Sequence, residues 1–363
     1  MKAAIVEAQG REFTMSDVEI DAPLGYEVLI DIKASGLCHS DLSVTTMGLG
    51  YEFPIVLGHE PAGVVSAVGP NVTSVDVGDH VVAGLVQFCG RCVNCLSGKS
   101  YRCLQPETTL RSEGERPRLS TADGPITQFM GLGGFAQQIL THENQLGLLP
   151  REMPFAQACL LGCGVLTGAG AVLNTADAQA GDSVVVIGAG GVGMNAVSGA
   201  RIAGATTIVV VDIQDAKLDR AREFGATHTI NSTRTDPVAE VLEITRHGAD
   251  HVFDVVGSRT VTRQGLEMLT KGGGLYLIGL AEVGAGLDLD ILSVLNNQQR
   301  VEGVFMGSSN LKRDLPLYAS LYLQGRLNLD DLVYKEVSLD RINEGYEALK
   351  EPTAARVVVT DLS

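Results

Sequence analysis

The chain has 363 residues, of which 45% are hydrophobic and 19% charged. A chain of this length and composition buries a full core, which excludes dominant disorder and suggests two domains or one large one. Its 27 Lys and Arg residues against 43 Asp and Glu residues give a net charge of −16, which disfavours a nucleic-acid binder because phosphate recognition needs clustered bases.

The N-terminal residues 1–7 already contain charged side chains, so the sequence predicts no signal peptide and a cytoplasmic protein. Two uncharged stretches, 153–176 and 183–200, are long enough to cross a membrane. Both are rich in glycine and small polar residues, so we interpret them as buried core. We therefore expect neither a membrane nor a nucleic acid as a partner.

The first half of the chain, to about residue 164, contains short apolar runs separated by turn residues. The runs 27–34, 63–69 and 79–84 alternate partly or are rich in valine, which is typical of strands. They predict an irregular, mostly β domain.

Four of the seven cysteines lie within residues 89–103. They are Cys89, Cys92, Cys95 and Cys103, and their spacing allows one short loop to surround a single ion. Structural zinc takes four tetrahedral ligands, so we predict a zinc here with no open coordination position. Free thiols or an iron–sulfur cluster are the alternatives, although nothing else in the sequence indicates electron transfer.

Three further candidate ligands, Cys38, His59 and Cys163, lie in glycine-flanked turns. Taken singly, such a cysteine is more often a small buried residue and such a histidine a satisfied core residue. Together the three offer two sulfur ligands and one nitrogen ligand with a fourth position open, the arrangement of a catalytic zinc. The spacing alone leaves open whether they meet in space.

From residue 183 the pattern changes to strands alternating with helices, which predicts a parallel sheet covered on both faces. The expected strands are 183–187, 207–211, 251–255, 274–278 and 301–305, and the expected helices are 192–203 and 216–224. After residue 306 the segments 313–324 and 339–350 have the pattern of helices.

A glycine-rich turn follows the first of these strands and opens the first helix. It reads Gly188-Ala-Gly190-Gly191-Val192-Gly193, with Asp212 at the end of the next strand. Such glycines allow a tight turn and a close approach to a pyrophosphate, while the acidic residue accepts hydrogen bonds from a ribose. The pattern predicts a dinucleotide site that prefers NAD over NADP. The alternative is a glycine-rich turn that binds another ligand.

Taken in order, these motifs resemble the zinc-dependent medium-chain alcohol dehydrogenases over essentially the whole chain. The motifs that carry the resemblance are Gly36-Leu-Cys-His-Ser-Asp41, Gly58-His-Glu-Pro-Ala-Gly63, the four-cysteine segment, Leu161-Gly-Cys-Gly164 and the glycine-rich turn. The resemblance implies an α/β fold in which a Rossmann NAD-binding domain is inserted into a GroES-like irregular β-barrel catalytic domain. The implied bounds are 165–306 for the NAD domain and 1–164 with 307–363 for the catalytic domain, whose structural zinc lobe is 89–103.

The resemblance also implies two Zn²⁺ ions and one NAD for each chain. Cys38, His59 and Cys163 would hold the catalytic zinc, and the four lobe cysteines the structural one. Glu60 would lie behind the catalytic metal, Asp41 would fix the ring of His59 and Ser40 would relay the substrate's proton.

Four more residues would contact the cofactor, by the same resemblance. His39 and Arg356 would touch the pyrophosphate, and Thr167 and Val192 would back the nicotinamide. Without the resemblance, Ser40 would be interpreted as a turn residue, Asp41 as a helix cap and Arg356 as a surface charge.

The chain departs from the family pattern at two positions. Some relatives place a histidine three residues after the relay serine, where this chain has Ser43, so water would complete proton release. Glutathione-dependent formaldehyde dehydrogenases of the family carry an arginine shortly after the last lobe cysteine. The matching residue here is Glu107, and Arg111 is displaced from that position.

We therefore expect an NAD-dependent oxidoreductase that acts on a primary or secondary alcohol, or on its aldehyde or ketone. One alternative is a thiol-cofactor-dependent formaldehyde dehydrogenase of the same family, and a remote one is a non-catalytic protein that binds zinc and a nucleotide. The substrate stays open because pocket loops vary. The resemblance further implies a homodimer or homotetramer, in which the strand 301–305 could pair across a twofold axis.

Overall fold

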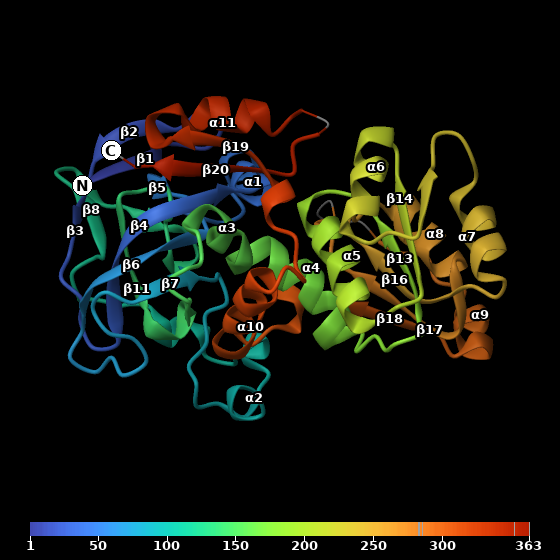
Figure 1. Ribbon diagram of the computed structural model, residues 1–363. Coiled ribbons are helices and arrows are strands. Elements are labelled where there is room, and N and C mark those ends of the chain that lie inside the picture. Colours follow the sequence, from blue (N-terminus) through green and yellow to red (C-terminus); the bar gives the residue numbers. More distant parts are fainter. Residues whose placement is uncertain (282–283, 285, 352, 363) are drawn as a thin grey trace. The chain divides into compact units, whose positions relative to one another are not determined.

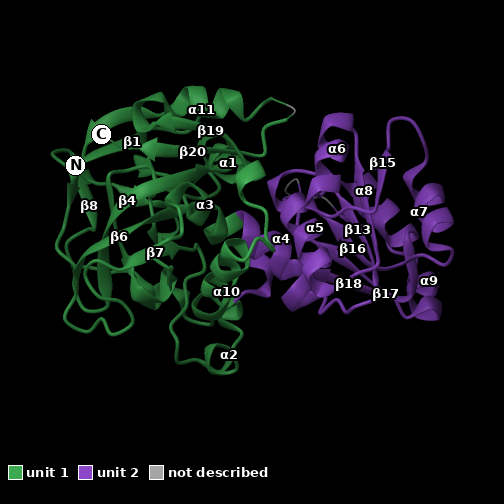
Figure 2. Ribbon diagram, viewed as in Figure 1, with its two compact units in different colours: residues 1–163, 310–363 green, residues 164–309 purple. Residues whose placement is uncertain are grey.

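The computed structural model describes residues 1–281, 284, 286–351 and 353–362 (Figure 1). The chain divides into two compact units, shown in different colours in Figure 2. Unit 1 comprises residues 1–163 and 310–363, and unit 2 comprises residues 164–309. Unit 2 is thus inserted, in sequence, between the two parts of unit 1.

Unit 1 is built mainly of strands, as the sequence predicted. Its largest sheet has the order β12-β7-β6-β4-β20-β19, and β11 also pairs with β4. These strands are β4 (Glu27–Leu37), β6 (Pro61–Val68), β7 (His80–Ala83), β11 (Gln138–His142), β12 (Leu146–Leu148), β19 (Val333–Ser338) and β20 (Arg356–Asp361). Because β20 pairs antiparallel with β4, the C-terminal segment completes a sheet that the N-terminal segment begins.

Two smaller sheets and several helices complete unit 1. The remaining strands are β1 (Lys2–Val6), β2 (Thr14–Asp17), β3 (Glu19–Ile20), β5 (Ile55–Val56), β8 (Leu119–Thr121), β9 (Gly124–Pro125) and β10 (Thr127–Gln128). The helices are α1 (His39–Met47), α2 (Val93–Leu96), α3 (Phe155–Leu160), α10 (Leu311–Leu323) and α11 (Ile342–Ala348). One apolar cluster, which includes Leu37, Phe135, Tyr346 and Val357, joins the N-terminal and C-terminal segments in a common core.

Unit 2 contains a six-stranded sheet of order β15-β14-β13-β16-β17-β18, in which every pairing is parallel. The strands are β13 (Ser183–Ile187), β14 (Thr207–Asp212), β15 (His228–Asn231), β16 (Ala249–Asp254), β17 (Leu269–Leu277) and β18 (Arg300–Gly303). The helices are α4 (Leu166–Gly170), α5 (Gly191–Ala203), α6 (Asp215–Phe224), α7 (Pro237–Thr245), α8 (Arg259–Glu267) and α9 (Ile291–Asn297). This strand order is that of dinucleotide-binding Rossmann folds, so the predicted α/β fold class is confirmed.

The apolar stretch near residue 160 forms a helix, Phe155–Thr175, that is long and apolar enough to span a membrane by length and composition. However, 83% of its most apolar window is buried inside the protein. The interpretation of residues 153–176 as buried core is therefore confirmed. The second stretch, 183–200, forms the buried strand β13, the glycine-rich turn and most of α5.

Candidate metal centres and nucleotide site

A buried cluster of metal-ligand atoms lies in unit 1. One ligand atom from each of Cys38, His59, Glu60 and Cys163 lies within 4.8 Å of the others, and all four residues are buried. Cys38 follows β4, His59 and Glu60 precede β6, and Cys163 lies in a wider π-helical turn, Leu161–Val165. Such turns are frequent at functional sites. The structure therefore brings together the three predicted ligands and places Glu60 beside them.

Asp41 ties this cluster to α1. Its Oδ1 accepts a hydrogen bond from the Gly58 backbone N–H at 3.1 Å and lies 3.0 Å from His59 Nδ1, while its Oδ2 accepts from the Cys38 N–H at 3.3 Å. Asp41 is thus both a helix-capping residue and the partner of His59. With Nδ1 engaged, the remaining nitrogen of His59, Nε2, is buried and makes no hydrogen bond to any described residue. A buried ring nitrogen without a partner fits a metal ligand.

Two glycines make room for this arrangement. A Cβ at Gly36 would lie 2.3 Å from Glu60 Oε2, so only glycine in β4 leaves space for that carboxylate. Gly58 has a φ of +92°, and a Cβ there would lie 2.8 Å from the backbone nitrogen of Phe135. The glycines of the two sequence motifs are therefore required by packing around the cluster.

Arg356 lies behind the cluster rather than on the surface. Its Nη2 is 3.3 Å from Glu60 Oε1 and 4.0 Å from Cys38 Sγ, and the residue is 5% exposed. A hydrogen bond with Cys163 and, against the effect of burial, the charge of Arg356 hold the pKa of the Cys38 thiol well below its usual value. Zinc binds the thiolate, so this environment favours metal binding.

Ser40 and His39 open α1 on the side of Cys38. Ser40 is half-buried, and its Oγ lies 3.6 Å from Cys38 Sγ. His39 is exposed, and Ser43 donates to the His39 carbonyl. A half-buried hydroxyl beside the cluster is suitably placed to pass a proton to water.

A wall of aromatic and thioether side chains borders His59. The Phe129 ring meets the His59 ring edge-on with centroids 5.7 Å apart, and Tyr51 meets Phe129 at 5.0 Å. The Tyr51 hydroxyl contacts Met130 Sδ at 3.3 Å. The low aromatic content of the chain gave no sign of such a wall, because it is assembled from two loops distant in sequence.

The four lobe cysteines form a second cluster, in which the sulfur atoms all lie within 4.8 Å of one another. The Cys92 and Cys95 sulfurs are 3.4 Å apart, and those of Cys89 and Cys95 are 3.9 Å apart. Four sulfurs around a tetrahedral zinc, at about 2.3 Å each, lie roughly 3.8 Å from one another. Backbone N–H groups of Leu104 and Cys95 lower the pKa of Cys92 to about 6, which favours the thiolate.

The glycine-rich turn of unit 2 joins β13 to α5. Gly188 has a φ of +101°, and a Cβ at Gly193 would lie 1.9 Å from the Gly188 carbonyl oxygen. In contrast, a Cβ at Gly190 would meet nothing within 4 Å. The turn therefore leaves open space at the N-terminus of a 13-residue helix, which fits a phosphate group.

Asp212 ends β14 beside this turn. Its Oδ2 accepts from the Ala189 N–H at 2.8 Å, and its Oδ1 accepts from Ile213 and Gln214 at 2.8 and 3.0 Å. These backbone donors fix the carboxylate in place. Thr167 and Val192 are both half-buried, and Thr167 Oγ1 contacts Met306 Sδ at 3.5 Å.

Arg111 is displaced from the position at which glutathione-dependent formaldehyde dehydrogenases carry an arginine. In the structure it is held in a buried ion-pair network. It pairs with Asp21 at 2.6 Å and with Glu27 at 2.7 Å, and its side chain is 8% exposed. Arg118 pairs with the same Glu27 at 2.7 Å. Arg111 is therefore committed to structure rather than presented to a ligand.

Glu27→Gln is expected to lower the free energy of unfolding by about 3 kcal/mol, because the change leaves two buried arginines without their anion. Burial alone would raise the pKa of Glu27, but hydrogen bonds from Arg111 and the charge of Arg118 hold it below its usual value. The ion pairs therefore stabilise the fold fully above the unfolded pKa, about 4.3, and the stabilisation is lost as pH falls through the folded pKa. Urea unfolding at neutral and acidic pH measures the loss of unfolding free energy. Glu19→Gln, at an exposed position, is the matched control. An equal loss in both variants would contradict the prediction.

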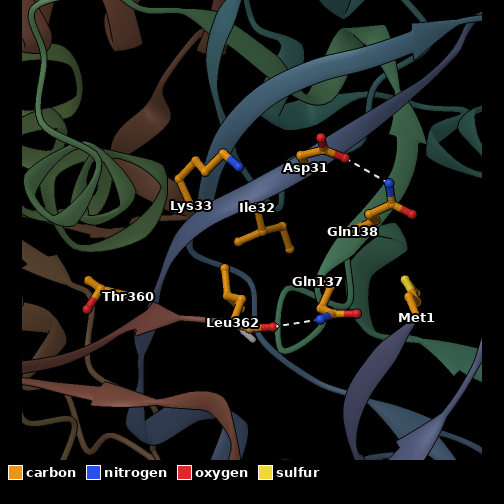
Figure 3. Close-up of a pocket in the computed structure, with 8 residues that line it drawn as sticks. All are labelled: Met1, Asp31, Ile32, Lys33, Gln137, Gln138, Thr360 and Leu362. Carbon is orange, nitrogen blue, oxygen red and sulfur yellow. Dashed lines mark hydrogen bonds between the residues drawn. The ribbon is translucent and has the colours of Figure 1, made fainter.

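A polar pocket of about 440 Å³ lies elsewhere in unit 1 (Figure 3). Within it, Gln138 donates to Asp31 at 2.7 Å and Gln137 donates to the Leu362 carbonyl at 2.9 Å. None of the predicted site residues lines this pocket. Its hydrogen bonds tie β4 and β11 to the C-terminal segment, which indicates a structural role.

Comparisons with known proteins agree with these features. Residues 25–151 match the family described as alcohol dehydrogenase GroES-like domain, and residues 191–321 match that described as zinc-binding dehydrogenase. An S-(hydroxymethyl)glutathione dehydrogenase of Paracoccus denitrificans is 36% identical over 99% of both chains. A solved alcohol dehydrogenase zinc-binding domain protein from Burkholderia ambifaria has a TM-score of 0.95 at 38% identity, covering 99% of this chain and 98% of its own. A benzyl alcohol dehydrogenase from Acinetobacter calcoaceticus has a TM-score of 0.94 at 33% identity, covering 99% of both chains.

Proposed function

Because the chain belongs to the zinc-dependent medium-chain alcohol dehydrogenase family, we propose that it oxidises an alcohol to its aldehyde or ketone with NAD as hydride acceptor, and catalyses the reverse reaction. The observation that carries the proposal is the buried cluster of two thiols and one imidazole, in a chain that also has a dinucleotide cradle.

Cys38, His59 and Cys163 hold the catalytic zinc in this proposal, and Cys89, Cys92, Cys95 and Cys103 hold the structural one. When bound at the first site, zinc supplies Lewis acidity, which lowers the pKa of an alcohol hydroxyl or polarises a carbonyl group. Three protein ligands leave a position for substrate, whereas four lobe thiolates leave none. The lobe therefore stabilises its loop and takes no part in the chemistry.

The chain's own residues orient the ligands and move the proton. Asp41 holds Nδ1 of His59, which leaves Nε2 as the ligand nitrogen. Ser40 Oγ accepts the proton of the substrate hydroxyl and passes it to water, because Ser43 offers no imidazole to continue the relay. Glu60 and Arg356 form an ion pair that balances charge behind the ligands.

The nucleotide is held by unit 2 in this proposal. Its pyrophosphate occupies the open space at Gly190, and Asp212 accepts hydrogen bonds from the ribose. Thr167 and Val192 back the nicotinamide in this proposal. When bound, NAD supplies the hydride acceptor. The corresponding functional division is a catalytic domain of residues 1–164 and 307–363 and a nucleotide domain of residues 165–306.

The wall formed by Phe129, Tyr51 and Met130 favours an alcohol with an apolar, preferably aromatic, substituent. The Phe129 ring lies next to His59, near which the reacting carbon must lie, Tyr51 packs against Phe129, and the Tyr51 hydroxyl contacts Met130. The similarity to a benzyl alcohol dehydrogenase supports the same substrate class.

A thiol-dependent formaldehyde dehydrogenase is the second candidate, and the relative from Paracoccus denitrificans favours it. Two features of this chain oppose it. Arg111 is engaged by Asp21 and Glu27, so it is not available to bind the carboxylate of a thiol carrier. Glu107, at the matching position, is exposed and would repel that carboxylate.

We expect benzyl alcohol to be oxidised with a kcat/KM about tenfold or more above that of ethanol. Transfer of an aromatic ring from water to an apolar wall contributes more than about 1.4 kcal/mol, which is a factor of ten in rate. The rate of NADH formation with each alcohol measures this difference in kcat/KM. Met130→Gln should reduce the difference, because glutamine is similar in size to methionine but makes the wall polar. The same assay with formaldehyde, with and without glutathione, separates the two candidates. Activity that strictly requires glutathione would establish the second.

We also propose that the protein is a cytoplasmic homodimer or homotetramer. Strand β18 lies at the edge of its sheet, and the nearby helix α9 exposes Ile291, Leu292 and Leu295 by 77, 67 and 66%. Edge strands can pair across a twofold axis, and a partner copy would cover these side chains. A reducing cytoplasm would keep the lobe thiols available to metal.

A further inference from the structure

The aromatic wall beside His59 is carried by a chain segment with an unusual backbone conformation. Phe129, whose ring borders His59, is followed by Met130, whose sulfur contacts the Tyr51 hydroxyl. Met130 has a φ of +53° and Gly131 a φ of +69°. Glycine adopts such a conformation freely, whereas a residue with a side chain keeps it only where the surrounding structure fixes it. Some contact must therefore hold the backbone of Met130.

The side-chain amide of Gln145 makes that contact. Gln145 is fully buried, and its Nε2 donates to the Met130 carbonyl at 3.0 Å and to the Gly84 carbonyl at 3.2 Å. Its Oε1 accepts from the Thr141 hydroxyl at 3.0 Å. Both partners of Nε2 are carbonyl oxygens, so only the donating end of an amide fits between them. The amide is thus engaged at both ends, which fixes its orientation.

The amide is in turn anchored to the main sheet of unit 1. Gln145 directly precedes β12, which pairs with β7. The Gly84 N–H, directly after β7, donates to the Gln145 backbone carbonyl at 2.8 Å, so the two residues are bonded in both directions. The wall segment also packs closely here, because a Cβ at Gly131 would lie 3.1 Å from Gln145 Oε1. A well-ordered sheet end therefore holds the wall through one side chain.

We propose that Gln145 is a positioning residue that sets the preference for aromatic alcohols. Its amide holds the Met130 carbonyl and so fixes the backbone that places the Phe129 ring beside His59. Without the amide, Met130 returns to an ordinary backbone conformation, and the wall loses its fit to the substrate. The inference rests on the proposed function and deepens it, because Gln145 acts on the substrate through the wall rather than by touching it.

Steady-state kinetics of Gln145→Met test the inference. Methionine is similar in size to glutamine but offers no donor to the two carbonyl oxygens. We expect the KM for benzyl alcohol to rise about fivefold or more while kcat stays within about twofold, the pattern of lost substrate binding without lost chemistry. The KM for ethanol should change little, because ethanol is too small to use the wall.

Hydrogen exchange measured by mass spectrometry gives a second readout that needs no turnover. The Leu132 and Gly133 N–H groups both donate to the Phe129 carbonyl, so exchange in residues 129–134 reports on the fold of the segment. Exchange there should be faster in Gln145→Met. Thr141→Val removes the hydroxyl that orients the amide, in a strand that accommodates valine, and should cause both changes to a smaller extent.

Gln138→Met is the matched control. Gln138 is a half-buried glutamine in β11 that donates to Asp31 instead of to the wall, so its loss should change neither the KM for benzyl alcohol nor exchange in residues 129–134. Wild-type exchange in Gln145→Met, an unchanged KM for benzyl alcohol or an equal rise of KM for both alcohols would overturn the inference. A wild-type protein that forms no NADH with any alcohol would instead refute the proposed function.

Discussion

Cys38→Ala and Cys163→Ala are each expected to lower kcat/KM for alcohol oxidation by about 10³-fold or more. Each change removes one of three protein ligands from the buried cluster, and the Lewis acidity lost with the metal contributes several kcal/mol to transition-state stabilisation. NADH formation measures the loss. The affinity for NAD, measured by calorimetry, should stay unchanged, because other residues form the dinucleotide-binding turn.

The chain offers a matched control in Cys159. This cysteine is buried in α3, four residues before Cys163, and its thiol donates to the Ala156 carbonyl instead of joining the metal-ligand cluster. Burial raises its pKa well above the usual value, so it stays a neutral thiol. Cys159→Ala should therefore retain turnover close to wild type. Equal losses in the Cys159 and Cys163 variants would indicate a general packing effect and contradict the assignment of Cys163.

Gly190→Val is expected to weaken NAD binding by about 100-fold, or roughly 2.7 kcal/mol, while leaving the fold intact. Gly190 has an extended backbone conformation, which valine adopts readily, and a Cβ there meets nothing within 4 Å. The added side chain would therefore occupy the space that we assign to the pyrophosphate. Calorimetric titration with NAD, together with thermal unfolding, separates binding from stability.

Gly303→Val is the control for this second prediction. Gly303 lies in β18 of the same unit, and a Cβ there also meets nothing within 4 Å. It should bind NAD as the wild type does. Unchanged affinity in Gly190→Val would mean that the turn does not hold the pyrophosphate.

The fold of unit 2 could be predicted largely from the sequence. Strand β13 has its predicted bounds, and α5 and α6 each begin one residue before the predicted position and end at Ala203 and Phe224 as expected. The buried parallel strands are continuous apolar runs, and a glycine follows the C-terminal end of each of the two helices. Both patterns are strong sequence signals of secondary structure. Strand β15 and helices α7, α8 and α9 were not predicted; β15 has only four residues, and α8 is polar. The predicted strand 301–305 ends earlier, at Gly303, and Phe305 is 53% exposed.

The sequence could name candidate ligands but could not show that they meet. Cys38, His59 and Cys163 come from a strand end, a loop and a π-helical turn, and only the fold places them within one cluster. The pairing of Glu60 with Arg356 depends on β20 lying beside β4, a pairing between the two ends of the chain. Local sequence patterns do not indicate contacts between segments that are distant in sequence. Without the family resemblance, the sequence therefore predicts Arg356 only as a surface charge.

The same limit applies to the residues that distinguish the two candidate substrates. The engagement of Arg111 by Asp21 and Glu27 and the wall formed by Phe129 and Tyr51 both depend on loops that are remote in sequence. No motif marks either feature. They bear on substrate choice, whereas the sequence motifs bear on the reaction class.

Zinc content per chain, measured by atomic emission on the wild type and on Cys163→Ala, tests the central claim most directly. The account predicts two zinc ions in the wild type and one, held by the four-cysteine lobe, in the variant, with alcohol oxidation lost in the variant. Two zinc ions retained in Cys163→Ala together with undiminished NADH formation would contradict the assignment of the catalytic metal to this cluster.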